Sequence, residues 1–342
     1  MLIMMGLNTL QKDIETVKND IIKAGCTPHE IPGSKKLAIG VTGASEKLER
    51  EQFLMLPSVE EVIPVTKKFK LVSRIMKPDD TIIDFGNAAI GGKELNIIAG
   101  PCSVEDRDTM FRIAEELKKL GLKFMRGGAY KPRSSPYAFQ GLKEKGLKIL
   151  DEVKKEFDLK IVTEVLNPRN LKAVAEVADI LQIGSRNMQN FALLQETGNT
   201  GKPVLLKRGM SASIEDFLLS AEYVINENNY NIILCERGIR TFETATRNTL
   251  DLNAVPVIKT HSHLPVVVDP SHGIGIGAKV PAMALAAIAA GANGLILEVH
   301  TEPSKAWSDG YQTISIETLK NIMVKIKRLA PIVDKEFHYN ER

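Results

Sequence analysis

Eight short apolar runs recur between residues 96 and 300, and a helical stretch separates each run from the next. The runs read IIAG, FM, KIVT, ILQIGS, VLL, IILC, VVV and LIL. Their interiors are rich in β-branched residues and almost continuously apolar, as strands buried on both faces of a parallel sheet require. Eight such strands that alternate with crossover helices predict the α/β class and a closed (β/α)8 TIM barrel.

Residues 1–66 show a different order of elements. MLIMM is typical of a strand, and the helix that follows carries one apolar face, formed by Leu10, Ile14, Val17 and Ile21. Gly25 is placed to end this helix. Two short β segments, CTPHEIPG and KLAIGVTG, a helical stretch, SEKLEREQFLML, and a closing strand, VEEVIPV, complete the order βαββαβ. This order predicts a small N-terminal ferredoxin-like α+β domain.

The chain of 342 residues has room for one barrel of about 250 residues and this small domain. We therefore expect a domain over residues 1–66, a linker and a hairpin over residues 67–94, and the barrel over residues 95–342. The hairpin, with a turn near Asn87, is expected at the mouth of the barrel.

Composition excludes several classes of protein. The net charge is only +3, so the chain as a whole is not expected to bind nucleic acid or a membrane. The N-terminus MLIMMGL is too short and too uncharged for a signal peptide, and no run reaches the roughly 18 apolar residues of a membrane span. Three cysteines form no disulfide framework and suit a reducing compartment. We expect a cytoplasmic protein.

Four potential metal ligands follow three of the predicted strands. Cys102 ends the first run, His272 the seventh and Glu298 the eighth, and Asp309 lies eleven residues after Glu298. Strands one, seven and eight are neighbours in a closed barrel, so these side chains can converge. A buried cysteine or a lone histidine is more often structural than a ligand. Together at strand ends, a thiolate, an imidazole and two carboxylates favour one divalent ion of the Mn, Fe, Co or Zn class.

Basic residues also gather at or just after the predicted strand ends. Crowded cations at a barrel mouth are costly without anions, so they predict a substrate, or substrates, with phosphate and carboxylate groups. These residues are Arg126, Lys131, Arg133, Arg186, Lys207, Arg208 and Arg237.

Three acidic residues near the strand ends have less definite roles. Glu164 and Glu236 could each act as a general base or hold a neighbouring arginine, and we favour the second role. Asp269 is better suited to orienting the DPSH loop or its histidine than to binding a metal.

Longer motifs link these residues to a known family. The stretches AGPCS, RGGAYKPRSSPYAFQG, IGSRNMQNF, LLKRGM, ERGIRTFE, VDPSHG and LEVHTEP with SDG closely resemble 3-deoxy-D-arabino-heptulosonate 7-phosphate (DAHP) synthase. The resemblance covers residues 95–342. It is closest to the subtype that shares its barrel with 3-deoxy-D-manno-octulosonate 8-phosphate (KDO8P) synthase. Some members of this subtype carry an N-terminal ferredoxin-like regulatory domain.

The resemblance implies a transferase that condenses phosphoenolpyruvate with erythrose 4-phosphate and releases phosphate. This is the first step of the shikimate pathway to chorismate and the aromatic amino acids. The implied metal ligands are Cys102, His272, Glu298 and Asp309. The implied phosphoenolpyruvate residues are Arg126, Lys131, Ser185, Arg186, Lys207 and Arg237. The implied erythrose 4-phosphate residues are Lys131, Pro132, Arg133, Ser134 and Ser135. Catalytic roles fall to Cys102, Lys131 and His272.

Several alternatives stay open at this point. The general acid and base are Lys131, His272 or a metal-bound water. The rival substrate is arabinose 5-phosphate, as in KDO8P synthase, although that group has a KANR-type turn where this chain has KPRSS. A metal-dependent aldolase and a ligand sensor with an inactive barrel are further rivals. The resemblance also implies a homo-oligomer, with a tetramer expected. Feedback inhibition by Tyr or Phe at the N-terminal domain is weighed against a role as a tether for assembly.

Overall fold

The computed structural model describes residues 1–339 except 7, 33–35, 44–47, 64–67 and 134. The chain divides into two compact units, each of which makes most of its contacts within itself. The first comprises Met1–Asp80 with His261–His263, and the second comprises Thr81–Thr260 with Leu264–Arg342. Among the described residues, every helix is too short or too polar to traverse a lipid bilayer.

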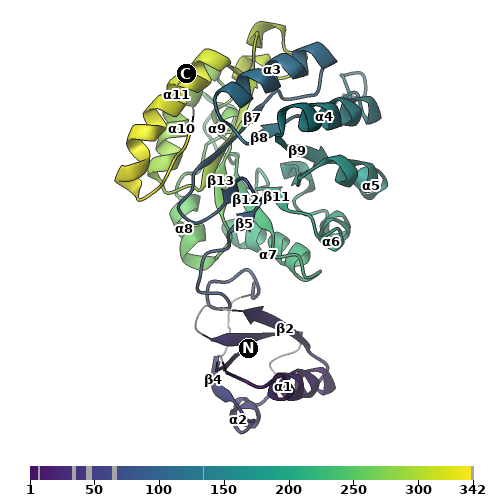
Figure 1. Ribbon diagram of the computed structural model, residues 1–342, viewed down its shortest axis with the longest axis vertical. Helices are drawn as coiled ribbons and strands as arrows, with labels where there is room; N and C mark the ends of the chain where they lie inside the picture. The colour runs from purple at the N-terminus through teal and green to yellow at the C-terminus, as the bar shows by residue number, and fades with distance from the viewer. Residues whose placement is uncertain (7, 33–35, 44–47, 64–67, 134, 340–342) are drawn as a thin grey trace. The chain divides into compact units, whose positions relative to one another are not determined.

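The first unit has the ferredoxin-like order that the sequence predicts. Its elements are β1 (Leu2–Met5), α1 (Gln11–Lys23), β2 (Thr27–Pro32), β3 (Leu37–Thr42), α2 (Arg50–Leu54) and β4 (Val59–Ile63). The strands form one sheet in the order β2-β3-β1-β4, and β1 runs antiparallel to both of its neighbours (Figure 1). The predicted order βαββαβ is therefore confirmed.

The apolar face of α1 follows the predicted spacing with one exception. Ile14, Val17 and Ile21 are buried in the core of this unit, and Gly25 ends the helix with a φ of 76°. Leu10 was expected on the same face, but it precedes the helix and is 69% exposed. That expectation was wrong because an extended residue before the first turn does not share the helical periodicity.

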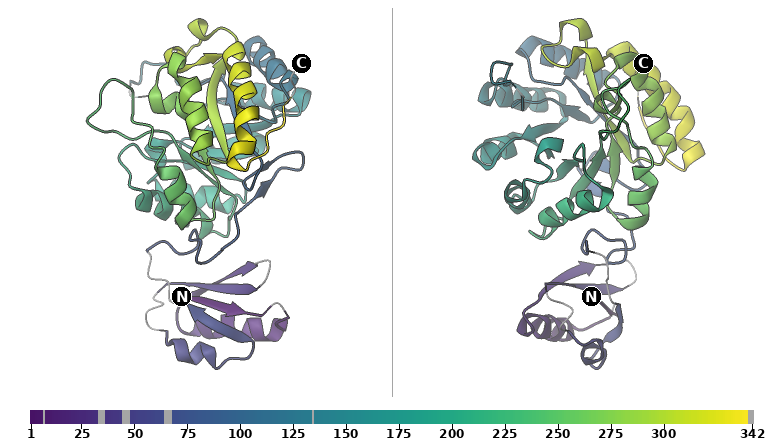
Figure 2. Two further views of the ribbon diagram at one scale, coloured as in Figure 1. Left: turned by 90° about the vertical axis from the view of Figure 1, so that its left-hand side faces the viewer. Right: turned by 180° about the vertical axis from the view of Figure 1, so that it is seen from behind.

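The second unit is a closed barrel of eight parallel strands. The strands are β7 (Asn96–Gly100), β8 (Phe124–Arg126), β9 (Lys160–Val165), β10 (Ile180–Ile183), β11 (Val204–Lys207), β12 (Ile232–Glu236), β13 (Val266–Val268) and β14 (Gly294–His300). Each strand pairs with the next, and β14 pairs with β7 to close the ring (Figure 2). All eight apolar runs of the sequence are strands, so the predicted (β/α)8 fold is confirmed.

Helices surround the strands, as Figure 1 shows. They are α3 (Arg107–Lys119), α4 (Glu144–Phe157), α5 (Pro168–Val177), α6 (Phe191–Asn199), α7 (Ile214–Ile225), α8 (Ala254–His261), α9 (Pro270–Ile274), α10 (Val280–Ala289) and α11 (Ile316–Leu329). A short strand, β15 (Ile314–Ser315), pairs in parallel with the end of β14 and precedes α11. Since each strand leads into a loop and then a helix, the carboxyl ends of all eight strands lie at one end of the barrel.

The hairpin predicted near Asn87 exists, but it closes the other end of the barrel. Its strands are β5 (Ile83–Asp84) and β6 (Ala89–Ile90). The two isoleucines are buried in a cluster with Phe124, the first residue of β8. The expected position at the mouth was wrong because this hairpin is apolar on one face. It therefore packs on the apolar starts of the strands, whereas the mouth is lined by charged residues.

Candidate active site

A cleft of about 700 Å³ opens at the carboxyl ends of the barrel strands. Most of the predicted site residues line it, and they come from loops that are far apart in the sequence. The predicted residues in its wall are Arg126, Lys131, Pro132, Arg133, Ser185, Arg186, Lys207, Arg237, His272 and Asp309. Cys102 and Glu298 are buried, at 2% and 1% exposure.

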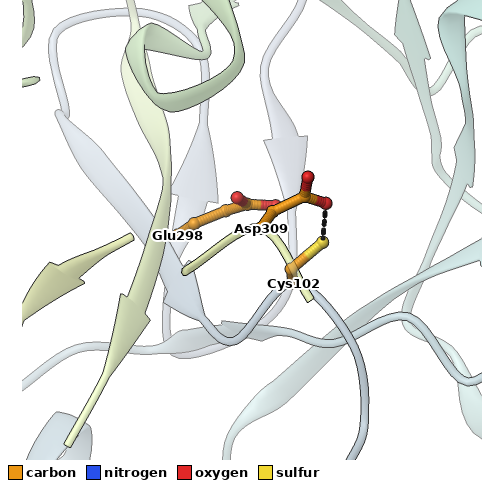
Figure 3. A group of neighbouring side chains, drawn as sticks. All are labelled: Cys102, Glu298 and Asp309. Atoms are coloured by element: carbon orange, nitrogen blue, oxygen red, sulfur yellow. Dashed lines mark hydrogen bonds between the residues drawn. The ribbon is translucent and has the colours of Figure 1, made fainter. Parts of the chain in front are cut away.

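The predicted metal ligands lie together. Potential ligand atoms of Cys102, Glu298 and Asp309 all lie within 4.8 Å of one another. The Cys102 thiol donates a hydrogen bond of 2.9 Å to Asp309 Oδ2, and Figure 3 shows the sulfur facing this carboxylate with Glu298 beside it. His272 Nε2 lies 3.4 Å from Glu298 Oε1. One thiol, two carboxylates and one imidazole therefore converge, although more than 200 residues separate Cys102 from Asp309.

Local backbone geometry brings these ligands close. Gly100 ends β7 with a φ of +147°, and a Cβ atom there would lie 2.2 Å from the backbone oxygen of Arg126. Only glycine allows this approach, which places the PCS turn with Cys102 next to the end of β8. Asp309 has a left-handed backbone with a φ of 52°.

Burial and nearby charges set the ionisation of this group. Burial raises the pKa of the Cys102 thiol to about 12, with a further contribution from the negative charge of Glu298. Burial alone would also raise the pKa of Glu298, but the charges of His272, Arg126 and Lys131 outweigh it and lower this pKa to about 2. At neutral pH the site therefore holds a protonated thiol beside an ionised carboxylate.

Asp269 orients the imidazole. Its carboxylate accepts a hydrogen bond of 2.9 Å from the backbone N–H of His272, caps α9 and forms an ion pair with Lys207 at 2.5 Å. The Asp269 Oδ2 atom also lies 2.7 Å from His272 Nδ1, although this buried nitrogen makes no hydrogen bond of good geometry. Burial lowers the pKa of His272, so the ring is neutral at pH 7 and suited to bind a metal.

Two cations of the cleft contact the potential metal ligands directly. Arg126 donates to Glu298 Oε1 at 3.0 Å and to the carbonyl oxygen of Pro101 at 2.9 Å, and its buried Nε has no hydrogen-bond partner. Lys131 Nζ donates to the sulfur of Cys102 at 2.9 Å. These contacts join the cationic part of the cleft to the ligand group.

The predicted sugar-phosphate loop is described only in part. Arg133 and Pro132 line the cleft, and Arg133 Nε donates to the carbonyl oxygen of Phe139 at 3.2 Å. Ser135 is exposed and lies outside the cleft wall, where its hydroxyl accepts from the N–H of Tyr137. The predicted site residue Ser134 lies outside the described residues.

Comparison with known proteins decides the family. Residues 74–334 match the DAHP synthetase I family, and residues 1–67 match the DAHP synthase ferredoxin-like domain. The chain belongs to the DAHP synthetase I family.

Members of this family and related aldolases are similar over most of the chain. A phospho-2-dehydro-3-deoxyheptonate aldolase of Thermotoga maritima is 50% identical over 330 residues, which are 96% of this chain and 98% of that protein. A crystal structure of phospho-2-dehydro-3-deoxyheptonate aldolase (DAHP synthase) from Thermotoga maritima matches with a TM-score of 0.79 and 48% identity, covering 98% of this chain and 99% of that one. A 2-dehydro-3-deoxyphosphooctonate aldolase of Desulfosudis oleivorans is 31% identical over 72% of this chain and 94% of that protein.

In this DAHP synthetase I family member, one of the cations predicted at the barrel mouth does not line the cleft. Arg208 was expected at the mouth, but its guanidinium pairs with Glu236 at 2.9 Å and with Asp251 at 2.8 Å. Glu236 thus holds an arginine, although the one it holds is not the adjacent Arg237. Burial raises the pKa of Glu236, which Arg208 partly offsets.

Sequence reasoning missed one cation of the cleft. Arg247 lines the wall, and its guanidinium lies 3.5 Å from Asp309 Oδ1 and hydrogen-bonds to Gln312. It lies eleven residues after β12 ends at Glu236, so proximity to a strand end gave no signal for it. The length and polarity of the loop GIRTFETATRNT were the available hint.

Proposed function

We propose that this chain condenses phosphoenolpyruvate with erythrose 4-phosphate and water to give DAHP and phosphate, the first step of the shikimate pathway. The observation that carries the proposal is a cleft in which strand-end cations adjoin a group of one thiol, two carboxylates and one imidazole. Family membership and the Thermotoga relative, which is named for this activity, support it.

The ligand group suits a divalent metal ion. The buried carboxylate of Glu298 and the half-buried carboxylate of Asp309 lie beside the Cys102 thiol, so hard oxygen donors and a soft sulfur donor lie close together. Cys102, His272, Glu298 and Asp309 would hold one ion of the Mn, Fe, Co or Zn class, which accept such mixed donors. When bound, this ion supplies Lewis acidity toward a substrate oxygen.

The residues of the chain bind and orient both substrates. In this proposal Arg186, Lys207 and Arg237, with Arg126, Lys131 and the backbone of Ser185, hold the phosphate and carboxylate of phosphoenolpyruvate. Arg133, Pro132 and the two serines that follow hold the phosphate of the aldose. Fixing both anions places the carbon nucleophile of phosphoenolpyruvate next to the aldehyde, so most of the rate gain comes from positioning and electrostatics. Lys131 Nζ and His272 Nε2 are the protein groups placed to move protons.

A two-substrate assay tests the activity. We expect phosphate release from phosphoenolpyruvate with erythrose 4-phosphate, and a kcat/KM at least about 100-fold lower with arabinose 5-phosphate, because a site that binds one aldose rejects a longer one by a few kcal/mol. A preference for arabinose 5-phosphate would instead establish the KDO8P synthase reaction. Condensation without phosphate release would indicate a simple aldolase, and no turnover would leave a ligand sensor.

Arg133→Ala tests the aldose site. A charge-assisted hydrogen bond contributes about 1.5–3 kcal/mol, so we expect the KM for erythrose 4-phosphate to rise roughly 10- to 100-fold. The KM for phosphoenolpyruvate should change by less than about threefold, because other cations hold that substrate. Arg107→Ala, on the exposed start of α3, is the control. A matched rise in both KM values would contradict the assignment of Arg133.

We propose that residues 1–66 form a regulatory domain that binds Tyr or Phe, that residues 67–94 link it to the barrel, and that the chain assembles as a tetramer in the cytoplasm. A chain that begins at residue 67 should keep its kcat and lose inhibition by Tyr and Phe. Steady-state assays with each amino acid measure this effect. Inhibition that survives the truncation would contradict the regulatory role. If the truncated chain no longer forms a tetramer and the full chain does not respond to Tyr or Phe, the domain would instead be a tether for assembly.

A further inference from the structure

A buried hydrogen-bonded pair, Glu105 and His300, lies behind the metal ligands and has no part in the proposed reaction. Glu105, in the loop between β7 and α3, is 2% exposed, and His300, the last residue of β14, is 3% exposed. His300 Nε2 lies 3.2 Å from Glu105 Oε2. A buried carboxylate is costly unless all of its hydrogen bonds are made, so its contacts indicate what it does.

Both oxygens of Glu105 hold the loop that carries Asp309. The N–H of Glu302 donates to His300 Nδ1 at 2.9 Å, so the ring hydrogen lies on Nε2 and is donated to Glu105. The second carboxylate oxygen accepts from the backbone N–H of Trp307 at 2.8 Å. Glu105 therefore holds this loop at its start, through His300, and at Trp307, two residues before Asp309.

A second bond joins the same two loops beside the ligands themselves. The hydroxyls of Ser103 and Ser308 lie 2.7 Å apart, and both serines are buried. Ser103 follows Cys102, and Ser308 precedes Asp309. Besides the direct bond between Cys102 and Asp309, contacts one to three residues away from them therefore help to set their spacing.

The loop that Glu105 holds also contacts the sugar-phosphate loop. The rings of Trp307 and Phe139 pack edge to face, with centroids 5.4 Å apart and planes at 81°. The carbonyl oxygen of Phe139 accepts the hydrogen bond from Arg133. A continuous path of contacts therefore runs from Arg133 through Phe139 and Trp307 to Glu105.

We propose that Glu105 is a positioning residue, which sets the separation of Cys102 and Asp309 and, through Trp307, couples it to the loop that binds the aldose phosphate. This inference rests on the proposed metal site. Groups that orient metal ligands from behind typically change metal affinity by about 10- to 100-fold when they are altered. Glu105 does this by orienting a loop, because among the described residues its hydrogen bonds go to His300 and Trp307 and not to the four ligand side chains.

Cobalt binding to the metal-free full-length chain tests the proposal. Charge-transfer absorption between the thiolate and cobalt reports cobalt binding to Cys102 directly, without any need for turnover. Glu105→Gln keeps the shape of the side chain, but its amide N–H₂ must face one of the two groups that donate hydrogen bonds to Glu105. One of these two hydrogen bonds is therefore lost. We expect cobalt binding roughly 10- to 100-fold weaker than in the unaltered chain. Glu115→Gln, on the exposed face of α3, is the matched control and should bind cobalt unchanged.

Two further measurements separate positioning from a general loss of structure. Trp307 is the single tryptophan of the chain, so its fluorescence reports this loop. Erythrose 4-phosphate should change that fluorescence in the Glu115→Gln control and much less in Glu105→Gln. In the assay, Glu105→Gln should raise the KM for erythrose 4-phosphate more than that for phosphoenolpyruvate. If Glu105→Gln fails to fold by circular dichroism, Ser308→Ala decides, with several-fold weaker cobalt binding expected.

The outcomes distinguish this inference from the proposed function. Cobalt affinity of folded Glu105→Gln within about twofold of the control, with the charge-transfer absorption intact, would overturn the positioning role and leave the metal site standing. Unchanged affinity in Ser308→Ala, where that variant decides, would overturn it too. Absence of the charge-transfer absorption in the unaltered chain, or its presence in Cys102→Ala, would overturn the metal site itself.

Discussion

Cys102→Ala is expected to abolish DAHP formation and stoichiometric metal binding while the barrel stays folded. The thiol is the one soft donor of the group, and it lies within 4.8 Å of ligand atoms of Glu298 and Asp309. Without it, the carboxylates of Glu298 and Asp309 and the imidazole of His272 would have to hold the ion alone. Lewis-acid stabilisation is worth several kcal/mol of the barrier, so we expect kcat to fall by at least about a thousandfold. Losing one sulfur atom should cost the fold about 1 kcal/mol.

Cys235→Ala is the matched control. Cys235 is also a buried free cysteine of a barrel strand, but it lies in the apolar interior and does not line the cleft. It should retain both metal and activity. Elemental analysis after dialysis against chelator, with the phosphate-release assay, measures both quantities. Full activity of Cys102→Ala in metal-free buffer would contradict the metal role.

The same thiol gives metal binding a defined pH dependence. Burial raises the pKa of Cys102 to about 12, so the thiol is protonated at neutral pH, whereas a metal binds the thiolate. Binding must therefore release a proton, and affinity should rise as pH rises, by up to about tenfold per unit. His272 adds no proton here, since burial lowers its pKa and the ring is already neutral. A competition titration of the unaltered chain between pH 6.5 and 8.5 measures this slope, and an affinity that does not change with pH would contradict proton release from Cys102.

The barrel and the place of its site could be predicted because both follow from local pattern. Apolar runs with turn signals mark strands, and the closed ring makes the first, seventh and eighth strands neighbours wherever they lie in the sequence. Cys102 and His272 could therefore be expected together without any contact being known. Asp309 was harder, because it lies in a loop eleven residues beyond Glu298. Its position after the eighth strand made it a candidate, and the motif resemblance implied the same residue.

Contacts made only in the folded chain explain what the sequence did not reveal. Arg208 and Lys207 are adjacent and equally basic, yet one pairs with Glu236 and the other lines the cleft. Arg247 reaches the cleft from the middle of a long loop. The sequence drew no prediction for Glu105, whose buried partner His300 is almost 200 residues away in the chain. Pattern gives the strand on which a residue lies, but side-chain partners depend on how loops pack.

Phe124→Ala is expected to lower the free energy of unfolding of the barrel by about 3–5 kcal/mol, because it leaves a large cavity in a close-packed layer. Phe124 is fully buried at the start of β8, where its ring packs edge to face on Phe85 with centroids 5.1 Å apart. It also contacts the cluster that holds Ile83 and Ile90 of the β5–β6 hairpin, so the cavity would separate this hairpin from the barrel interior. The strands cannot collapse far into this cavity, since hydrogen bonds around the closed ring fix their spacing.

Denaturant titration followed by the fluorescence of Trp307 measures this loss, because the single tryptophan belongs to the barrel and not to the ferredoxin-like domain. Phe242→Ala is the same substitution at a side chain that is 98% exposed, and it should change stability by less than about 0.5 kcal/mol. A loss below about 1 kcal/mol for Phe124→Ala would mean that the hairpin repacks into the space, and that it is not a fixed part of the barrel floor. A full loss would show that the apolar end of the barrel carries its stability. The charged end can then keep its cations and carboxylates crowded for chemistry, at a cost that this packing offsets.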